Sequence, residues 1–313
     1  MSEWFPVNVG LRQGCVMSPW LFNVHMDGVF REVNVRVLGK GLELLSANVG
    51  RFEINQLLLA DDTALVADSE EKLCRLVSEF GRVCERRKLR VNVGKSKVIR
   101  CSSFGNGYRM HMIQNGEPLE EVDCFKYLGS QVAADGGCES NVVHRMNEGY
   151  RAWAELKSVL SKRGLGIKAK KCLCEGVIVP TALYGAEAWG MRSAERRTVN
   201  VLEMKCLRTL VGVSRLDIVR NEEVHWRGGI ERELASTSDQ RVLRWFGHVE
   251  RMDDYRMAKR VLMAEVSGER LRGRPRLGWM DGVKVALGNR GMTVEAARQC
   301  PKDRKEWRAL VHM

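Results

Sequence analysis

The sequence predicts an α+β fold in which a mixed first part precedes a helical remainder. Short apolar runs separated by turn residues continue to about residue 137, which is typical of short strands. From about Ser140 the apolar residues recur at spacings of three and four, which predicts amphipathic helices. Gly136-Gly137 separates the two patterns, and Gly212 ends the last strongly periodic segment. The expected parts are residues 1–137, 138–213 and 214–313.

Size and composition limit the possible classes. The chain has 313 residues, of which 44% are hydrophobic, so a sizeable core can form. Ten cysteines show no CxxC pair, and no histidine pairs with another or with a cysteine at metal-ligand spacing. This favours reduced thiols in an intracellular protein, nuclear or cytoplasmic. We see no signal peptide and no apolar run long enough to cross a membrane.

Charge is distributed unevenly along the chain. The net charge is +12, yet residues 1–150 carry 18 basic and 19 acidic side chains, whereas residues 151–313 carry 33 and 20. A near-neutral part followed by a basic part favours a site-bearing domain joined to a domain that binds a polyanion. A protein with a merely basic surface fits the same charge distribution equally well.

The first motif is a glycine-rich loop, GLRQGCVMSP, at residues 10–19. Pro19 suits the first turn of a helix and Ser18 suits its N-cap, and apolar residues then predict a helix to about Val33. A loop of this kind before a helix is by itself a weak indication of function.

The second motif is LLLADDTALVAD at residues 57–68. Two short apolar runs flank Asp61 and Asp62, which predicts a buried hairpin with its carboxylates at the bend. Aspartate also favours ordinary surface turns, so a plain turn is one interpretation. The other is a carboxylate pair that binds a divalent metal ion.

The next elements follow from caps and periodicity. Ser69 is placed to cap a helix whose apolar residues run from Leu73 to Cys84. LRVNVGKSK at residues 89–97 predicts a short strand followed by a glycine turn, and it contains two lysines. FKYLGSQV at residues 125–132 predicts a further turn and strand.

Helices dominate the rest of the expected structure. One is expected from about Ser140 to Leu160, another over Ala169–Val179 ending before Pro180, and a third from Ser193 to Gly212. Later helices are expected around Val242–Phe246 and near the C-terminal end. The RGRP segment at residues 272–275 resembles the minor-groove hook of AT-binding proteins, but a solvated linker or a phosphate contact is the preferred interpretation of so short a match.

The order of the motifs carries more information than any one of them. GLRQGCVMSPWLF, LADD, LRVNVGKSK and FKYLG occur in this order and together resemble the palm motifs of reverse transcriptases, or RNA-directed DNA polymerases, of non-long-terminal-repeat retrotransposons. The resemblance implies a partial polymerase palm (an antiparallel sheet with packed helices) to about residue 137. A helical thumb and a basic helical C-terminal region would follow.

The resemblance also implies roles for individual residues. Asp61 would be a catalytic carboxylate that binds metal, and Asp62 its partner on the hairpin. Two Mg²⁺ ions about 4 Å apart would activate the primer 3′-hydroxyl and stabilise the leaving pyrophosphate. Lys95 would lie near the pyrophosphate. Arg12, Gln13 and Gly14 would contact the incoming dNTP and the template, although a surface ion pair is an equal alternative for Arg12.

The partners implied are an RNA template and a DNA primer, or their RNA–DNA hybrid. Phe125, Tyr127, Leu128 and Gly129 match the primer-grip turn, and simple packing is compatible with the same residues. A thumb follows the duplex through its phosphates. The basic side chains expected there are Lys168, Lys170, Lys171, Arg196, Arg197, Lys205 and Arg208.

One part of the family pattern is missing from the sequence. The family has a further catalytic Asp on a strand before the GLRQG loop, together with the fingers, whereas the nine residues before this loop hold only Glu3 as an acid. The interpretation is an N-terminally truncated reverse transcriptase that is inactive alone. The alternatives are a non-catalytic nucleic-acid-binding module and a retroelement copy without function.

Overall fold

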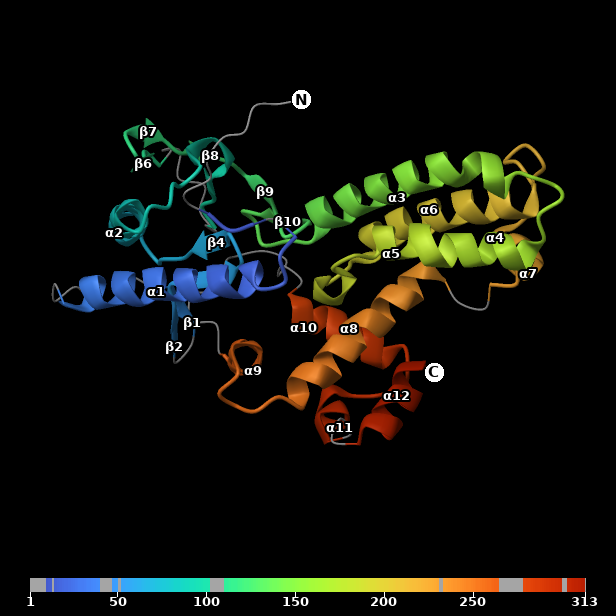
Figure 1. Ribbon diagram of the computed structural model, residues 1–313. Helices are drawn as coiled ribbons and strands as arrows, with labels where there is room; N and C mark the ends of the chain where they lie inside the picture. The colour runs from blue at the N-terminus through green and yellow to red at the C-terminus, as the bar shows by residue number, and fades with distance from the viewer. Residues whose placement is uncertain are drawn as a thin grey trace, which may run out of the picture. The chain divides into compact units, whose positions relative to one another are not determined.

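The computed structural model describes residues 10–12, 14–39, 47–49, 52–101, 110–230, 233–264, 278–299 and 303–312. This part of the chain is an α+β structure that is mostly helical and has several small sheets (Figure 1). Contacts divide the chain into two compact units. The first comprises Met1–Val98, Asn106–Val122 and Ala264–Glu269, and the second comprises Ile99–Gly105, Asp123–Met263 and Arg270–Met313.

The first unit contains two long helices and short strands that pair in twos. The helices are α1 (Ser18–Gly39) and α2 (Glu70–Arg86). The antiparallel pairs are β1 (Ala47–Val49) with β2 (Phe52–Ile54), β3 (Gln56–Leu59) with β4 (Asp62–Leu65), and β6 (Ile113–Gln114) with β7 (Glu117–Pro118). The remaining pair, β5 (Lys97–Val98) with β8 (Glu120–Glu121), is parallel.

Helix α2 begins where the sequence predicts. The Ser69 side chain accepts a hydrogen bond from the Lys72 backbone N–H at 3.3 Å, and acidic residues occupy the first turn, where they favour the helix dipole. Its apolar stripe packs against α1, where the Phe30 and Phe80 rings stack at 5.1 Å. This helix pair forms the larger of two apolar clusters in the described part of the first unit.

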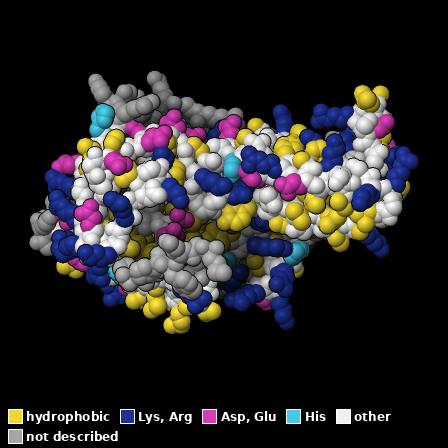
Figure 2. All heavy atoms as spheres, turned by 45° about the horizontal axis from the view of Figure 1, so that its top comes forward, with side chains coloured by type: hydrophobic (Ala, Val, Ile, Leu, Met, Phe, Trp, Pro, Cys, Tyr) yellow, Lys and Arg dark blue, Asp and Glu magenta, His cyan; other side chains and the backbone are white. Residues whose placement is uncertain are grey.

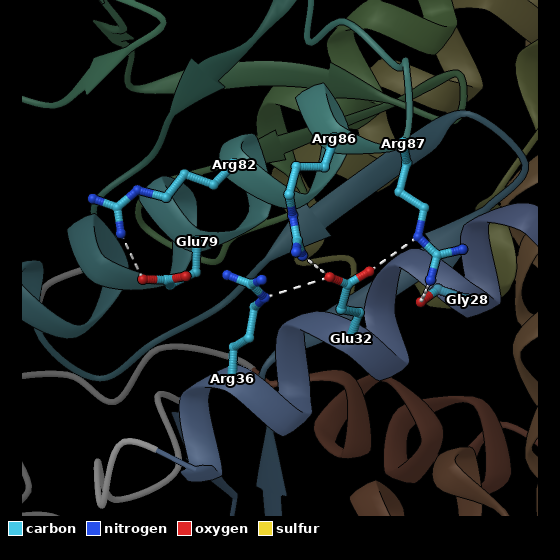
Figure 3. A network of polar contacts seen from close by, with 7 residues as sticks. All are labelled: Gly28, Glu32, Arg36, Glu79, Arg82, Arg86 and Arg87. Carbon is cyan, nitrogen blue, oxygen red and sulfur yellow. Dashed lines mark hydrogen bonds and ion pairs between the residues drawn. The ribbon is translucent and has the colours of Figure 1, made fainter.

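Charged side chains fasten the same two helices together. Glu32 on α1 accepts from Arg86, from Arg87 at 3.0 Å and from Arg36 at 3.4 Å (Figure 3). Arg87 also donates to the Gly28 carbonyl at 3.4 Å. Three guanidinium groups around one carboxylate leave this edge of the helix pair positively charged.

The second unit begins with a hairpin and continues as helices. Its strands are β9 (Cys124–Tyr127) and β10 (Ser130–Ala133), which pair antiparallel. Its α-helices are α3 (Glu139–Leu160), α4 (Ile167–Leu173), α5 (Val179–Ala182), α6 (Ser193–Val211), α7 (Asn221–Gly228), α8 (Leu234–Glu250), α9 (Met257–Met263), α10 (Trp279–Gly288), α11 (Val294–Gln299) and α12 (Arg304–His312).

Two apolar clusters hold these helices. Trp189 is fully enclosed in the first cluster, among residues of α3, α5 and α6. The second cluster surrounds Phe246 on α8. The centre of the Phe246 ring lies 6.4 Å from that of Trp279 and 6.0 Å from that of Trp307. As predicted, α6 stops at Gly212, which adopts a left-handed φ of 76°.

The structure corrects two sequence expectations. The helical path does not end before Pro180: a π-helical turn, Cys174–Ile178, leads into α5. Pro180 occupies the first turn of α5, where the backbone N–H that proline lacks costs little. The π turn before it includes Gly176, four positions earlier. The short strand expected at the start of residues 89–97 is absent. The expected glycine turn does form, as the 3₁₀ turn η1 (Val93–Lys95), where the Asn92 side chain bonds the backbone locally.

None of the helices in the described ranges is long and apolar enough to cross a membrane.

Candidate polymerase and nucleic-acid-binding sites

The predicted acidic hairpin is present, formed by β3 and β4 with their turn. Leu59 pairs with Asp62, so Ala60 and Asp61 form a two-residue turn, and Ala60 has a φ of 53°. Val66 N–H bonds the Asn55 carbonyl at 2.9 Å and Leu65 packs on the α1–α2 core. The base of the hairpin is therefore anchored while its turn projects from the core.

The expectation of a buried hairpin is wrong for its first strand. Leu57, Leu58 and Leu59 are 44%, 41% and 57% exposed, because β3 pairs with β4 alone among the described strands. Apolarity of sequence does not by itself supply a covering layer.

The two carboxylates at the turn are unneutralised by the described part of the chain. Asp61 and Asp62 are both exposed, and no described residue forms an ion pair or hydrogen bond with either carboxylate. Carboxylate oxygens are the hard ligands that Mg²⁺ prefers, so the donor type fits the metal. Among the described residues, however, no cluster of three or more potential ligands includes them. The hairpin supplies two ligands at most.

The GLRQG loop is folded back on its own helix. Ser18 donates its hydroxyl to the Arg12 carbonyl at 2.9 Å, and Gly14 has a left-handed φ of 84° that favours glycine. The Arg12 side chain is exposed and has no charged partner in the described ranges, while Gln13 lies outside them. Hydrogen bonds from Met17 and Ser18 lower the pKa of the Cys15 thiol.

Lys95 lies at the end of a turn with a defined shape. The Asn92 side-chain oxygen accepts the Lys95 backbone N–H at 3.1 Å, and the Ser96 hydroxyl donates to the Asn92 carbonyl at 2.9 Å. The Lys95 ammonium is exposed, without an acidic partner among the residues that the structure describes. Asn92 therefore fixes the backbone from which this cation extends.

The FKYLG segment forms the hairpin β9–β10, in the second unit. Its turn residues, Leu128 and Gly129, both have left-handed φ values, 48° and 80°. Phe125 and Tyr127 are half-buried on β9. Tyr184 donates its hydroxyl to the Leu128 carbonyl at 3.1 Å.

Two residues that sequence reasoning missed hold this turn. Arg145 on α3 donates to the Gly129 carbonyl, and its guanidinium lies 4.5 Å from the centre of the Tyr184 ring. A signal for Arg145 did exist, because it lies on the helical stripe that Val142 and Met146 bury. For Tyr184, which follows α5, no such pattern was available.

Most of the basic side chains expected to bind phosphate form hydrogen bonds or ion pairs with other residues of the chain. Lys170 is buried and donates to the Leu210 carbonyl at 3.3 Å, and Lys171 donates to the Gly229 carbonyl at 2.9 Å. Arg196 forms a bidentate pair with buried Asp239 at 2.6 and 3.0 Å. Arg208 braces the loop after α6 through the carbonyls of Ser214 and Val219.

Lys168, Arg197 and Lys205 remain available. Each is exposed, and no described acid pairs with any of them. The Lys205 ammonium lies over two rings, 4.8 Å from the centre of Tyr150 and 4.3 Å from that of Trp153. Lys and Arg side chains are visible at the right-hand end of the space-filling view, over the part of the second unit that contains α4 and α7, and also elsewhere on this face (Figure 2).

Comparison with known proteins finds similarity in the part of the chain that contains the motifs. Residues 1–132 match the family described as reverse transcriptase (RNA-dependent DNA polymerase). A transposon-derived protein of Caenorhabditis elegans is 27% identical over 277 residues, an alignment that covers 82% of this chain and 95% of that protein. The match to the family contains the GLRQG loop, the acidic hairpin and the FKYLG turn together. The first 132 residues are therefore similar to the reverse transcriptase family, and most of the chain is similar to a transposon-derived protein.

Proposed function

We propose that residues 1–137 are part of a polymerase palm that serves RNA-templated DNA synthesis on a primer. The acidic hairpin supports this proposal, because its two unneutralised carboxylates lie at an anchored two-residue turn within the residues that match the family. Asp61 would bind a divalent metal ion and Asp62 would support it. Bound Mg²⁺ would supply activation of the primer 3′-hydroxyl and charge stabilisation of the pyrophosphate.

The remaining residues would position the substrates. Lys95 would attract the pyrophosphate, and Arg12, Gln13 and Gly14 would contact the incoming dNTP, with Gly14 permitting close backbone approach. Phe125, Tyr127, Leu128 and Gly129 would hold the primer end. Residues 138–213 would serve as the thumb and residues 214–313 as a basic extension.

A second candidate function is binding of nucleic acid without catalysis. The excess of 33 basic over 20 acidic side chains in residues 151–313 favours it. The exposed cations of α4 and α6, led by Arg197 and Lys205, would contact phosphates of an RNA–DNA duplex. Both candidate functions require this contact.

Binding of an RNA–DNA primer–template by the full chain is expected to weaken steeply with salt. Replacing Arg197 and Lys205 by Gln removes up to two phosphate contacts, which should reduce the slope of log affinity against log salt by up to about 2. Fluorescence anisotropy between about 50 and 300 mM KCl measures this slope.

The matched control replaces two cations of the first unit that already have acidic partners, half-buried Lys72 and exposed Arg75. Lys72 pairs with Asp68 at 3.0 Å, and Arg75 pairs with Glu71. Their Gln variants should leave the slope unchanged. Affinity that does not respond to salt, or a slope that the Arg197 and Lys205 changes leave intact, would refute the assignment of the contact to α6.

A further inference from the structure

The turn at Leu128 and Gly129 has a backbone that needs support. Tyr127 pairs with Ser130, so a two-residue turn closes the hairpin, and both of its residues have positive φ. Turns of this type favour Asn-Gly, whereas leucine adopts the left-handed region only at a steric cost. The surrounding protein must supply the difference.

Side chains from two other segments hold both carbonyls of the turn. Tyr184 donates to the Leu128 carbonyl at 3.1 Å, and Arg145 donates to the Gly129 carbonyl. A third contact lies two residues after Gly129, where the Gln131 N–H donates to the side-chain oxygen of Asn141 on α3 at 3.0 Å.

The two clamping groups also fix each other. The Arg145 guanidinium lies over the Tyr184 ring at 4.5 Å from its centre. A β-carbon added at Gly129 would lie 3.0 Å from an Arg145 nitrogen and 3.2 Å from a Tyr184 ring carbon. The turn therefore fits closely between the two side chains, and glycine is required at its second position.

Arg145 is an unusual residue for this position. It is only 9% exposed, and its Nε atom has no hydrogen-bond partner among the described residues. Burying a cation without a carboxylate partner is costly, so a well-packed apolar residue on the α3 stripe would favour stability more. An apolar residue could not form the hydrogen bond that the Arg145 guanidinium donates to the Gly129 carbonyl.

We propose that Arg145 and Tyr184 are positioning residues that lock the 128–129 turn onto α3. The consequence is that the turn moves with α3, the first thumb helix, as one body. This inference rests on the proposed function in one respect: if the turn holds the primer, its fixed position sets where the primer 3′ end lies.

The test uses the full chain and removes one hydroxyl. Tyr184→Phe keeps the ring under Arg145 and deletes only the bond to the Leu128 carbonyl. Amide hydrogen exchange across residues 124–133 should become about five- to tenfold faster, as expected for loss of one hydrogen bond. Arg145→Met should accelerate it further. Tyr255→Phe, which changes a tyrosine that is 74% exposed, and Arg151→Met, which changes an exposed arginine on α3, should have no effect. Unchanged amide exchange in Tyr184→Phe would overturn the proposal that Arg145 and Tyr184 clamp the 128–129 turn.

A second readout separates the clamp from the primer contact. Affinity is compared between an RNA–DNA duplex with a recessed DNA 3′ end and a blunt duplex of equal length. The expected result is a preference of the wild-type chain for the recessed end, reduced about fivefold in Tyr184→Phe and kept in Tyr255→Phe. No preference in the wild type, with faster exchange in Tyr184→Phe, would refute the primer contact and leave the clamp standing. A preference that survives faster exchange would overturn the positioning role.

Discussion

Raising the pH from about 5 to about 8 is expected to lower the free energy of unfolding by about 2–3 kcal/mol through Glu203 alone. Glu203 on α6 is buried, and burial, reinforced by Glu233, raises its pKa to about 7 although the Leu234 N–H donates to it at 2.9 Å. Its second oxygen has no hydrogen-bond partner among the described residues. The carboxyl group is therefore stable in the fold when protonated.

The direction follows from proton linkage. The pKa of Glu203 is raised in the folded state above its ordinary value of 4.5. Between these two values the folded chain binds more protons than the unfolded chain, so stability is fully present below about pH 4.5 and is lost as the pH rises through about 7. Cys206 nearby does not contribute in this window, because burial raises its thiol pKa to about 12.

Urea denaturation of the full chain at several pH values measures the effect. Glu203→Gln keeps an acceptor for the Leu234 N–H but cannot ionise, so this variant should be more stable than wild type at pH 8 and similar near pH 5. The difference between the two proteins cancels the titration of all other groups. Glu222→Gln, at an exposed position in the first turn of α7, is the control. Identical pH profiles for wild type and Glu203→Gln would contradict the account.

A polypeptide of residues 1–313 is expected to extend a primer at no detectable rate, even with Mg²⁺, dNTPs and a primed RNA template. Two-metal transfer needs carboxylates that hold both ions, and the acidic hairpin offers Asp61 and Asp62. The described residues add no further acid to this pair.

Gel analysis of a labelled primer checks this expectation. Extension by the wild-type polypeptide that disappears in Asp61→Asn would contradict it, because the hairpin would then be working in a complete metal site. Extension that persists in Asp61→Asn would come from a contaminating polymerase, so the variant also serves as the control.

Local signals predicted much of the fold because they act within a few residues. The Ser69 cap predicted the start of α2, Gly212 predicted the end of α6, and the two apolar runs around Asp61 predicted the two strands of the acidic hairpin. Each depends on backbone hydrogen bonding that neighbouring residues complete.

Signals that depend on distant packing were less informative. Pro180 predicted a helix end, but a preceding π turn lets the helix continue. Apolar Leu57–Leu59 predicted burial, but no third described strand covers them. Lys170 and Arg196 looked like phosphate ligands, yet a carbonyl and a buried carboxylate bind them. Spacing in sequence cannot show which partner a long cation finds.

The candidate site likewise contains residues that local motifs predicted and residues that depend on distant contacts. Motif order identified the acidic hairpin, the GLRQG loop and the FKYLG turn, and the family match includes all three. Arg145 and Tyr184 escaped notice because their partners are backbone carbonyls 16 and 56 residues away in the chain. The roles of the individual site residues stay predictions until they are measured.

Binding of a divalent metal ion at the acidic hairpin tests the central claim most directly. Mn²⁺ added to isotope-labelled full chain should broaden the amide signals of Ala60 to Thr63 selectively, because a paramagnetic ion bound by the carboxylates lies close to these residues. Asp61→Asn should abolish the broadening, while Glu70→Gln, which changes an exposed acid in the first turn of α2, should preserve it. Broadening spread evenly over exposed acids, or unaffected by Asp61→Asn, would contradict the assignment of this hairpin as the metal-binding element of a polymerase palm.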